Sequence, residues 1–155
     1  MKKLLYLLLL LPLTVFTACD DKDDLAPFDM TLTVGGVTQS NNSFYAVSGD
    51  DVTIESLTVD PVGGKATDVA NVMFYLDNVP LWVNPWQVGE PISFSTVNIP
   101  VGVHTIGITG NLLQVGQSIQ TFASNYSLVI VDSQEDLPEG APAIGSYSQT
   151  INVSK

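Results

Sequence analysis

Val72-Met73-Phe74-Tyr75-Leu76-Asp77-Asn78 is the stretch that decides the fold of this 155-residue chain. Its first, third and fifth residues are apolar, so in an extended chain they face one side, as in a half-buried β-strand. Asp77-Asn78 then forms a two-residue turn, because both residue types tolerate the positive φ angles that tight hairpin turns require. The chain returns through residues 81–83, and the stretch therefore predicts a β-hairpin.

The same alternation and turn chemistry recur along the chain. Strands are expected at 28–34, 37–39, 44–47, 52–59, 69–76, 81–83, 92–94, 97–99, 103–109, 112–115, 119–122, 126–131 and 146–153. Gly35-Gly36 is expected to be the turn between the first two of these, and a parity change within 52–59 predicts a β-bulge. Short strands with turn signals at roughly eight- to twelve-residue spacing predict a single all-β domain at 28–155, an antiparallel sandwich or barrel.

Two segments resemble bacterial immunoglobulin-like domains. Val72-Met73-Phe74-Tyr75-Leu76-Asp77-Asn78-Val79-Pro80-Leu81 is similar to their V-x-F-Y-x-D-G pattern, with Asn78 in place of the usual glycine. Pro100-Val101-Gly102-Val103-His104-Thr105-Ile106 is similar to their P-x-G-x-H-T-L pattern one hairpin later. The resemblance implies an immunoglobulin-like antiparallel β-sandwich in which His104 is a structural residue at the start of a strand. It implies nothing specific about function.

The N-terminus has the pattern of a secretory signal. Lys2 and Lys3 precede an apolar run at 4–15, which is shorter than the roughly 20 apolar residues that span a bilayer. Phe16-Thr17-Ala18-Cys19 resembles the end of a bacterial lipoprotein signal. The resemblance implies that residues 1–18 are removed and that Cys19, the sole cysteine, is acylated and attached to lipid. The alternative is ordinary cleavage that leaves Cys19 unmodified.

Asp20-Asp21-Lys22-Asp23-Asp24 follows this cysteine directly. The run resembles the signal by which Bacteroidetes lipoproteins reach the outer face of the outer membrane, although any solvated linker could have this composition. Residues 19–27 are therefore expected to be an acidic tether between the lipidated cysteine and the domain. The expected location is the outer membrane, facing the cell exterior, with the periplasmic side as the alternative.

Charge excludes one class of partner. Loss of Lys2 and Lys3 would leave three lysines against 16 acidic residues, a formal charge of −13, and the chain has no arginine. Nucleic-acid binding depends on Lys and Arg side chains that neutralise phosphates. No nucleic acid is therefore expected among the partners.

Catalytic and cofactor chemistry has little support in the sequence. His104 is the only histidine and has no catalytic or metal-binding partner nearby in sequence. The acidic pairs and runs are expected to be solvated turn residues, with a calcium site left open; they are Asp50-Asp51, Asp60 with Asp68, and Asp132 with Glu135, Asp136 and Glu139. None of them has the spacing of an EF-hand loop. We therefore expect no enzyme, no metal and no cofactor.

Trp82 and Trp86 are the candidate binding residues. In an extended chain they would lie on the same side, and with Asn84 and Gln87 they could form a platform that stacks on a sugar ring. The alternative is that the indoles cover the core at an irregular sheet edge. The expected function is a displayed, non-enzymatic binding or accessory module with a glycan or envelope protein as its ligand. The alternative is a structural component that packs on another envelope protein.

Overall fold

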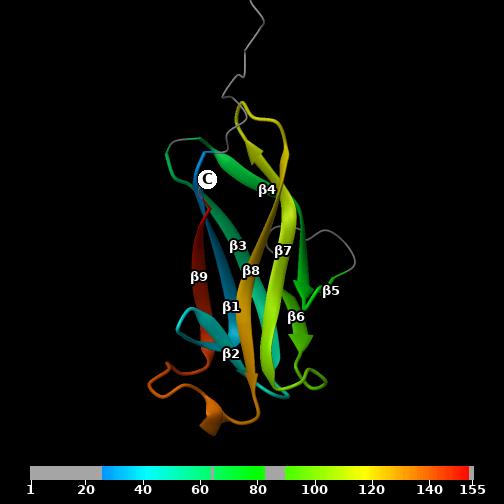
Figure 1. Cartoon of the computed structure of the whole chain (residues 1–155), viewed down its shortest axis with the longest axis vertical. Coiled ribbons are helices and arrows are strands. Elements are labelled where there is room, and N and C mark those ends of the chain that lie inside the picture. The colour runs from blue at the N-terminus through cyan, green and yellow to red at the C-terminus, as the bar shows by residue number, and fades with distance from the viewer. Residues whose placement is uncertain (1–25, 64, 83–89, 154–155) are drawn as a thin grey trace, which may run out of the picture.

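The computed structural model describes residues 26–63, 65–82 and 90–153, and strands make up most of them. The strands are β1 (Phe28–Ser40), β2 (Ser43–Val47), β3 (Asp51–Pro61), β4 (Thr67–Leu76), β5 (Val79–Pro80), β6 (Ile92–Ser95), β7 (Gly102–Gln114), β8 (Gln120–Val131) and β9 (Gly145–Val153). Within these described ranges the only helical element is the short 3-10 turn η2 (Gln134–Asp136) (Figure 1). The all-β prediction is confirmed.

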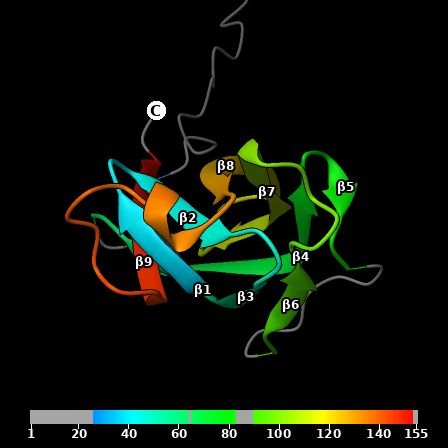
Figure 2. The same cartoon turned by 90° about the horizontal axis from the view of Figure 1, so that it is seen from below.

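The strands form one curled sheet. Its nine strands follow the order β5-β4-β7-β8-β2-β1-β3-β6, with β9 paired to β1 (Figure 2). The pairings are antiparallel except for β2 with β8, which run parallel. Strand β1 pairs with β3 and β9 along most of its length and with β2 at its last residues. It therefore connects two parts of the sheet, one made of β9, β1, β3 and β6 and the other of β2, β8, β7, β4 and β5.

Gly35-Gly36 is not the turn that the sequence predicted. The residues continue β1, with a shift of register against β9 between Val34 and Val37. Gly36 has a φ of 76°, and a Cβ there would lie 2.2 Å from the Asp51 carbonyl oxygen. Glycine is therefore needed for a close approach inside a long strand, and the chain reverses instead at Asn41-Asn42, whose φ angles are 46° and 62°.

Strands β7 and β8 are also longer than expected. The sequence predicted a break at Gly110-Asn111 and a separate hairpin beyond it, but β7 runs on to Gln114 and pairs with β8 throughout. A Cβ at Gly110 would lie 2.8 Å from the Phe122 ring, so this glycine makes room for a neighbouring side chain and does not end the strand. The predicted bulge in β3 is confirmed, because its pairing with β1 skips Glu55.

The core lies on the concave side of the curled sheet. Every second residue of the central strands is buried, as the alternation predicted. The largest fully buried side chains include Phe28, Met30, Leu32, Phe44, Ile54, Phe74, Ile106, Ile108, Leu112, Leu128 and Ile130. Burial of each such side chain contributes about 1.5–3 kcal/mol relative to an exposed position. The core therefore joins strands from both parts of the sheet.

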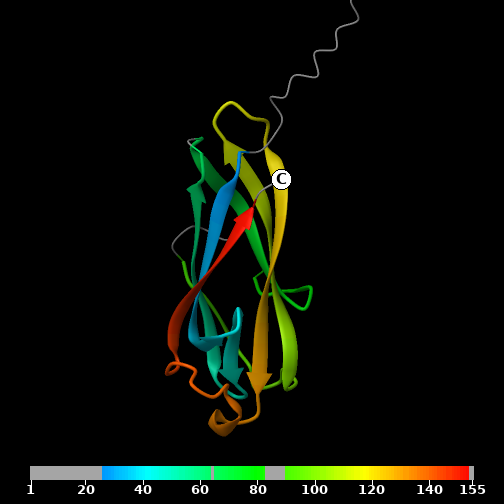
Figure 3. The same cartoon turned by 60° about the vertical axis from the view of Figure 1, so that its left-hand side comes forward.

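The elongated molecule has two distinct ends. The start of β1, the β3–β4 connection, the β7–β8 turn and the end of β9 lie together at one end (Figures 1 and 3). The β6–β7 connection and the segment with η2 lie at the opposite end. The proposed signal 1–18 and nearly all of the proposed tether 19–27 lie outside the described residues.

Candidate functional site: the β4–β5 corner

The β4–β5 turn is the tight turn that the sequence predicted at Asp77-Asn78, but the returning strand is Val79–Pro80 and does not include Leu81 or Trp82, where the sequence placed it. Asp77 and Asn78 have φ angles of 48° and 69°, and Leu76 pairs directly with Val79 across the turn. Positive φ at both central residues is the geometry that suits the twist of a two-residue hairpin. Strand β5 is the last strand of the sheet order, where Pro80 removes no interior ladder bond.

A histidine from β7 fixes this turn. The Nδ1 atom of His104 lies 2.5 Å from Oδ2 of Asp77, and its Nε2 lies 2.7 Å from the carbonyl oxygen of Pro100. The backbone N–H of Thr105 donates to Oδ1 of Asp77 at 2.9 Å, and the Asp77 N–H donates to the Thr105 carbonyl at 3.0 Å. We call this group the Asp77–His104 latch; it joins the turn to the first residues of β7.

The latch favours the charged form of the imidazole. The Pro100 carbonyl can only accept a hydrogen bond, and so can the Asp77 carboxylate, which means that both ring nitrogens must donate. Burial of the ring disfavours its charge, but the hydrogen bonds to Asp77 and Pro100 outweigh this and raise the pKa of His104 above its usual value. The hydrogen bond from His104 lowers the pKa of Asp77 in turn.

Sequence reasoning missed the partner of His104. It considered only neighbours along β7, whereas Asp77 lies 27 positions away. The sequence signal that could have identified this contact was the Asp77-Asn78 turn of one hairpin together with His104-Thr105 at the start of a later strand. Pairing of β4 with β7 places these two sites side by side.

Trp82 is the only one of the four candidate glycan-binding residues that the structure describes. It follows β5 and is 49% exposed, while the preceding Leu81 is partly buried and its N–H donates to the Phe74 carbonyl at 2.9 Å. Asn84, Trp86 and Gln87 lie outside the described residues. The backbone of β4 therefore holds the residue before Trp82, and the indole itself has a substantial exposed surface.

Exposed aliphatic side chains lie on the segments that the latch joins. Val79 is in β5, and Val101 and Val103 flank the start of β7, where Val103 is 75% exposed. We call Val79, Trp82, Val101 and Val103 the apolar corner. These individually exposed apolar side chains are the candidate contact residues near the latch.

The acidic residues that were expected in turns are divided between turns and strands: Asp60 lies in β3 and Asp68 in β4, so the turn prediction is wrong for these two. Asp50 and Asp51 stand at the start of β3, and Asp136 accepts hydrogen bonds from the backbone and hydroxyl of Ser133 at the start of η2. Within residues 26–63, 65–82 and 90–153, no three His, Cys, Asp or Glu side chains are grouped so that they could hold a metal ion.

Comparison with known proteins gives no relative for this chain. No protein-family model, no curated protein and no solved structure matches it. In the described part of the chain, no helix has both the length and the apolar character needed to cross a membrane.

Proposed function

We propose that this chain is a lipid-anchored, non-enzymatic binding module held at the outer membrane and facing the cell exterior. The observation that carries the proposal is the N-terminal pattern, in which Lys2-Lys3, an apolar run at 4–15 and Ala18 precede the sole cysteine. In this arrangement residues 1–18 are removed and the Cys19 sulfur and amine carry acyl chains. The acidic segment after Cys19 supports the outward location by its resemblance to lipoprotein export signals.

The anchor follows from acyl-chain physics. Each buried methylene contributes about 0.8 kcal/mol, and one myristoyl chain alone binds only marginally and reversibly. More than one chain on Cys19 therefore gives stable attachment without a spanning helix. Proteolysis of intact cells tests the location: an outward-facing protein is digested without cell lysis, whereas a periplasmic one is protected until the outer membrane is opened.

We further propose that the curled sheet is an immunoglobulin-like sandwich. Support comes from the pairing pattern, since β9, β1, β3 and β6 form one hydrogen-bonded group and β5, β4, β7, β8 and β2 form another, joined through β1. The buried Tyr126 hydroxyl on β8 donates to the Met30 carbonyl on β1 at 3.2 Å, across the core between these groups. A crystal structure with these two groups of strands face to face would support the proposal, and a closed barrel would contradict it.

The apolar corner is the proposed contact surface for the ligand, either a glycan or an envelope protein. A half-exposed indole offers a flat apolar face, and the backbone hydrogen bond from Leu81 and the Asp77–His104 latch hold the described segment that precedes it. Preorganised segments lose less conformational entropy on binding. No cofactor or metal is needed for such a contact.

Binding is tested with the mature chain and two matched variants. Trp82→Ala removes the indole, and Thr58→Ala changes an exposed residue on β3, away from the corner. We expect tryptophan fluorescence to respond to a polysaccharide, or native membranes to yield a crosslinked partner, in the wild-type and Thr58→Ala proteins but not in Trp82→Ala. Crosslinking to an envelope protein that persists in Trp82→Ala, without any glycan response, favours the structural-component alternative. Silence in both assays contradicts the proposal.

A further inference from the structure

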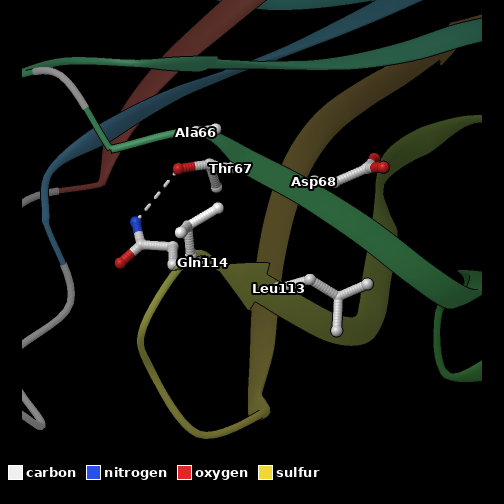
Figure 4. A pocket seen from close by; sticks show the side chains of 6 residues that line it. Ala66, Thr67, Asp68, Leu113 and Gln114 are labelled. Atoms are coloured by element: carbon white, nitrogen blue, oxygen red, sulfur yellow. Dashed lines mark hydrogen bonds between the residues drawn. The ribbon is translucent and has the colours of Figure 1, made fainter.

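The end of the molecule from which the tether departs has a fixed backbone. The Ala26 N–H donates to Oε1 of Gln114 at 3.0 Å, and Nε2 of Gln114 donates to the Ala26 carbonyl at 2.9 Å and to the Thr67 hydroxyl at 3.1 Å. Figure 4 shows Gln114, the last residue of β7, facing Thr67 of β4. Gln114 is buried, so its amide acts as a clamp that holds the first described residue against the end of β7.

Exposed aliphatic side chains surround this clamp. Val115 and Ile119 flank the β7–β8 turn and are 73% and 68% exposed. Leu113 and Val62 are also exposed, and the Val62 N–H donates to the Pro27 carbonyl at 2.9 Å, directly beside the tether. We call Val62, Leu113, Val115 and Ile119 the aliphatic tip.

The tether is too short to take the tip far from the anchor. Cys19 precedes Ala26 by seven positions, so the two residues can be separated by at most about 25 Å even in a fully extended chain. A tether of this length keeps the tip at an effective concentration in the millimolar range at the lipid surface. Weak apolar contacts are therefore sufficient to populate a docked state.

The two ends of the molecule differ in charge. The residues between Val115 and Ile119 are uncharged, and the charged side chains described near the tip are Asp29, which pairs with Asp60 across β1 and β3, and Asp60, Lys65 and Asp68. The acidic segment 132–139 lies at the opposite end of the molecule (Figure 1). Among the described residues, the tip is the less negative of the two ends, and the acidic tether that precedes it adds further negative charge, so a zwitterionic lipid surface suits this end better than an anionic one.

We propose that the aliphatic tip docks on the lipid surface, with Val115 and Ile119 at the boundary between headgroups and acyl chains. The proposal rests on the lipid anchor at Cys19. Docking fixes the orientation of the domain and directs the start of β7, with Val101 and Val103, away from the membrane. The tip and the apolar corner then have separate roles, one toward lipid and the other toward the ligand.

The test uses the mature chain, residues 19–155, coupled through its single thiol to a maleimide lipid in phosphatidylcholine vesicles. Trp82→Phe and Trp86→Phe remove the native indoles, and Val115→Trp introduces a reporter at the tip. Val101→Trp is the matched control, because Val101 is also an exposed valine beside a strand end but lies at the opposite end of the molecule. We expect brominated phosphatidylcholine to quench Val115→Trp several-fold more than Val101→Trp, and less strongly when anionic phosphatidylglycerol is added.

Several results would overturn the docking proposal. One is equal quenching at the two positions, and another is a solvent-like emission spectrum at the tip. A blue shift of the tip reporter without lipid quenching would indicate a second copy of the chain on the tip and would also contradict docking. Ile119→Trp is a second reporter in case Val115→Trp does not fold. Chemical coupling supplies the anchor, so this result is independent of whether the native Cys19 is acylated.

Discussion

Asp77→Asn isolates the charge of the Asp77–His104 latch. Asparagine has nearly the same volume, tolerates the φ of 48° at this position and can still accept a hydrogen bond from the Thr105 N–H. A hydrogen bond to a charged group contributes about 1.5–3 kcal/mol, and partial exposure of Asp77, whose side chain is 48% accessible, reduces this by solvent screening. We therefore expect Asp77→Asn to lower the free energy of unfolding by about 1–2 kcal/mol near pH 6.

The pH dependence of this loss has a defined sign. The pKa of His104 is raised from 6.5, so its contribution is complete below pH 6.5 and disappears as the pH rises through the folded-state value. The pKa of Asp77 is lowered from 3.8, so its contribution is present above pH 3.8 and disappears as the pH falls through the folded-state value. The difference between wild type and Asp77→Asn should be largest between these limits and should shrink above the folded-state pKa of His104.

Urea denaturation at pH 5.5 and pH 9 measures this difference, with Asp50→Asn as a control that removes one exposed carboxylate from another turn. NMR titration gives the pKa directly, because His104 is the only histidine and its ring signals need no assignment. We expect the pKa of His104 to exceed 6.5 in wild type and to fall in Asp77→Asn. A stability loss that is equal at both pH values, or an unchanged histidine pKa, would contradict a charged contact between His104 and Asp77.

Four further substitutions, of which Gly49→Ala is the control for Gly36→Ala, test the fold by urea denaturation. Tyr126→Phe removes a buried hydrogen-bond donor and should lower the free energy of unfolding by about 1 kcal/mol. In wild type, burial raises the pKa of Tyr126 to about 12. The stability of the wild-type protein should therefore fall above pH 10, where the tyrosine of the unfolded chain ionises first. Gly36→Ala should lower the free energy of unfolding by more than about 2 kcal/mol, because the Cβ would collide with the Asp51 carbonyl. At Gly49 a Cβ would meet open space, so Gly49→Ala should lower it only by the backbone strain of the positive φ. Thr96→Val should cost about 1–3 kcal/mol, because the buried hydroxyl accepts the Gly49 N–H. Equal losses for the two glycine variants, or no loss for Tyr126→Phe or Thr96→Val, would contradict the assigned contacts.

Local pattern was sufficient for some parts of this fold. Alternation alone placed Val72, Phe74 and Leu76 in the core, and residue type alone placed a positive-φ turn at Asp77-Asn78. Both features depend on neighbouring residues in the chain. For the same reason the parity change in 52–59 was sufficient to predict the β3 bulge.

Other features depend on residues that are distant in sequence. Gly36 and Gly110 resemble turn residues, but each is a glycine because a group from another strand approaches it closely. The His104 contact with Asp77 and the Gln114 contact with Ala26 likewise require the strand pairing to be known first. Local periodicity contains no information about such pairs, so the latch and the clamp could not be predicted.

The proposed function depends on lipid attachment at Cys19. Intact-mass spectrometry of the protein isolated from its native membranes tests this most directly. We expect a chain that starts at Cys19 and is heavier than its unmodified sequence by the mass of the acyl groups. A chain with an unmodified Cys19, recovered from the aqueous fraction, would contradict it.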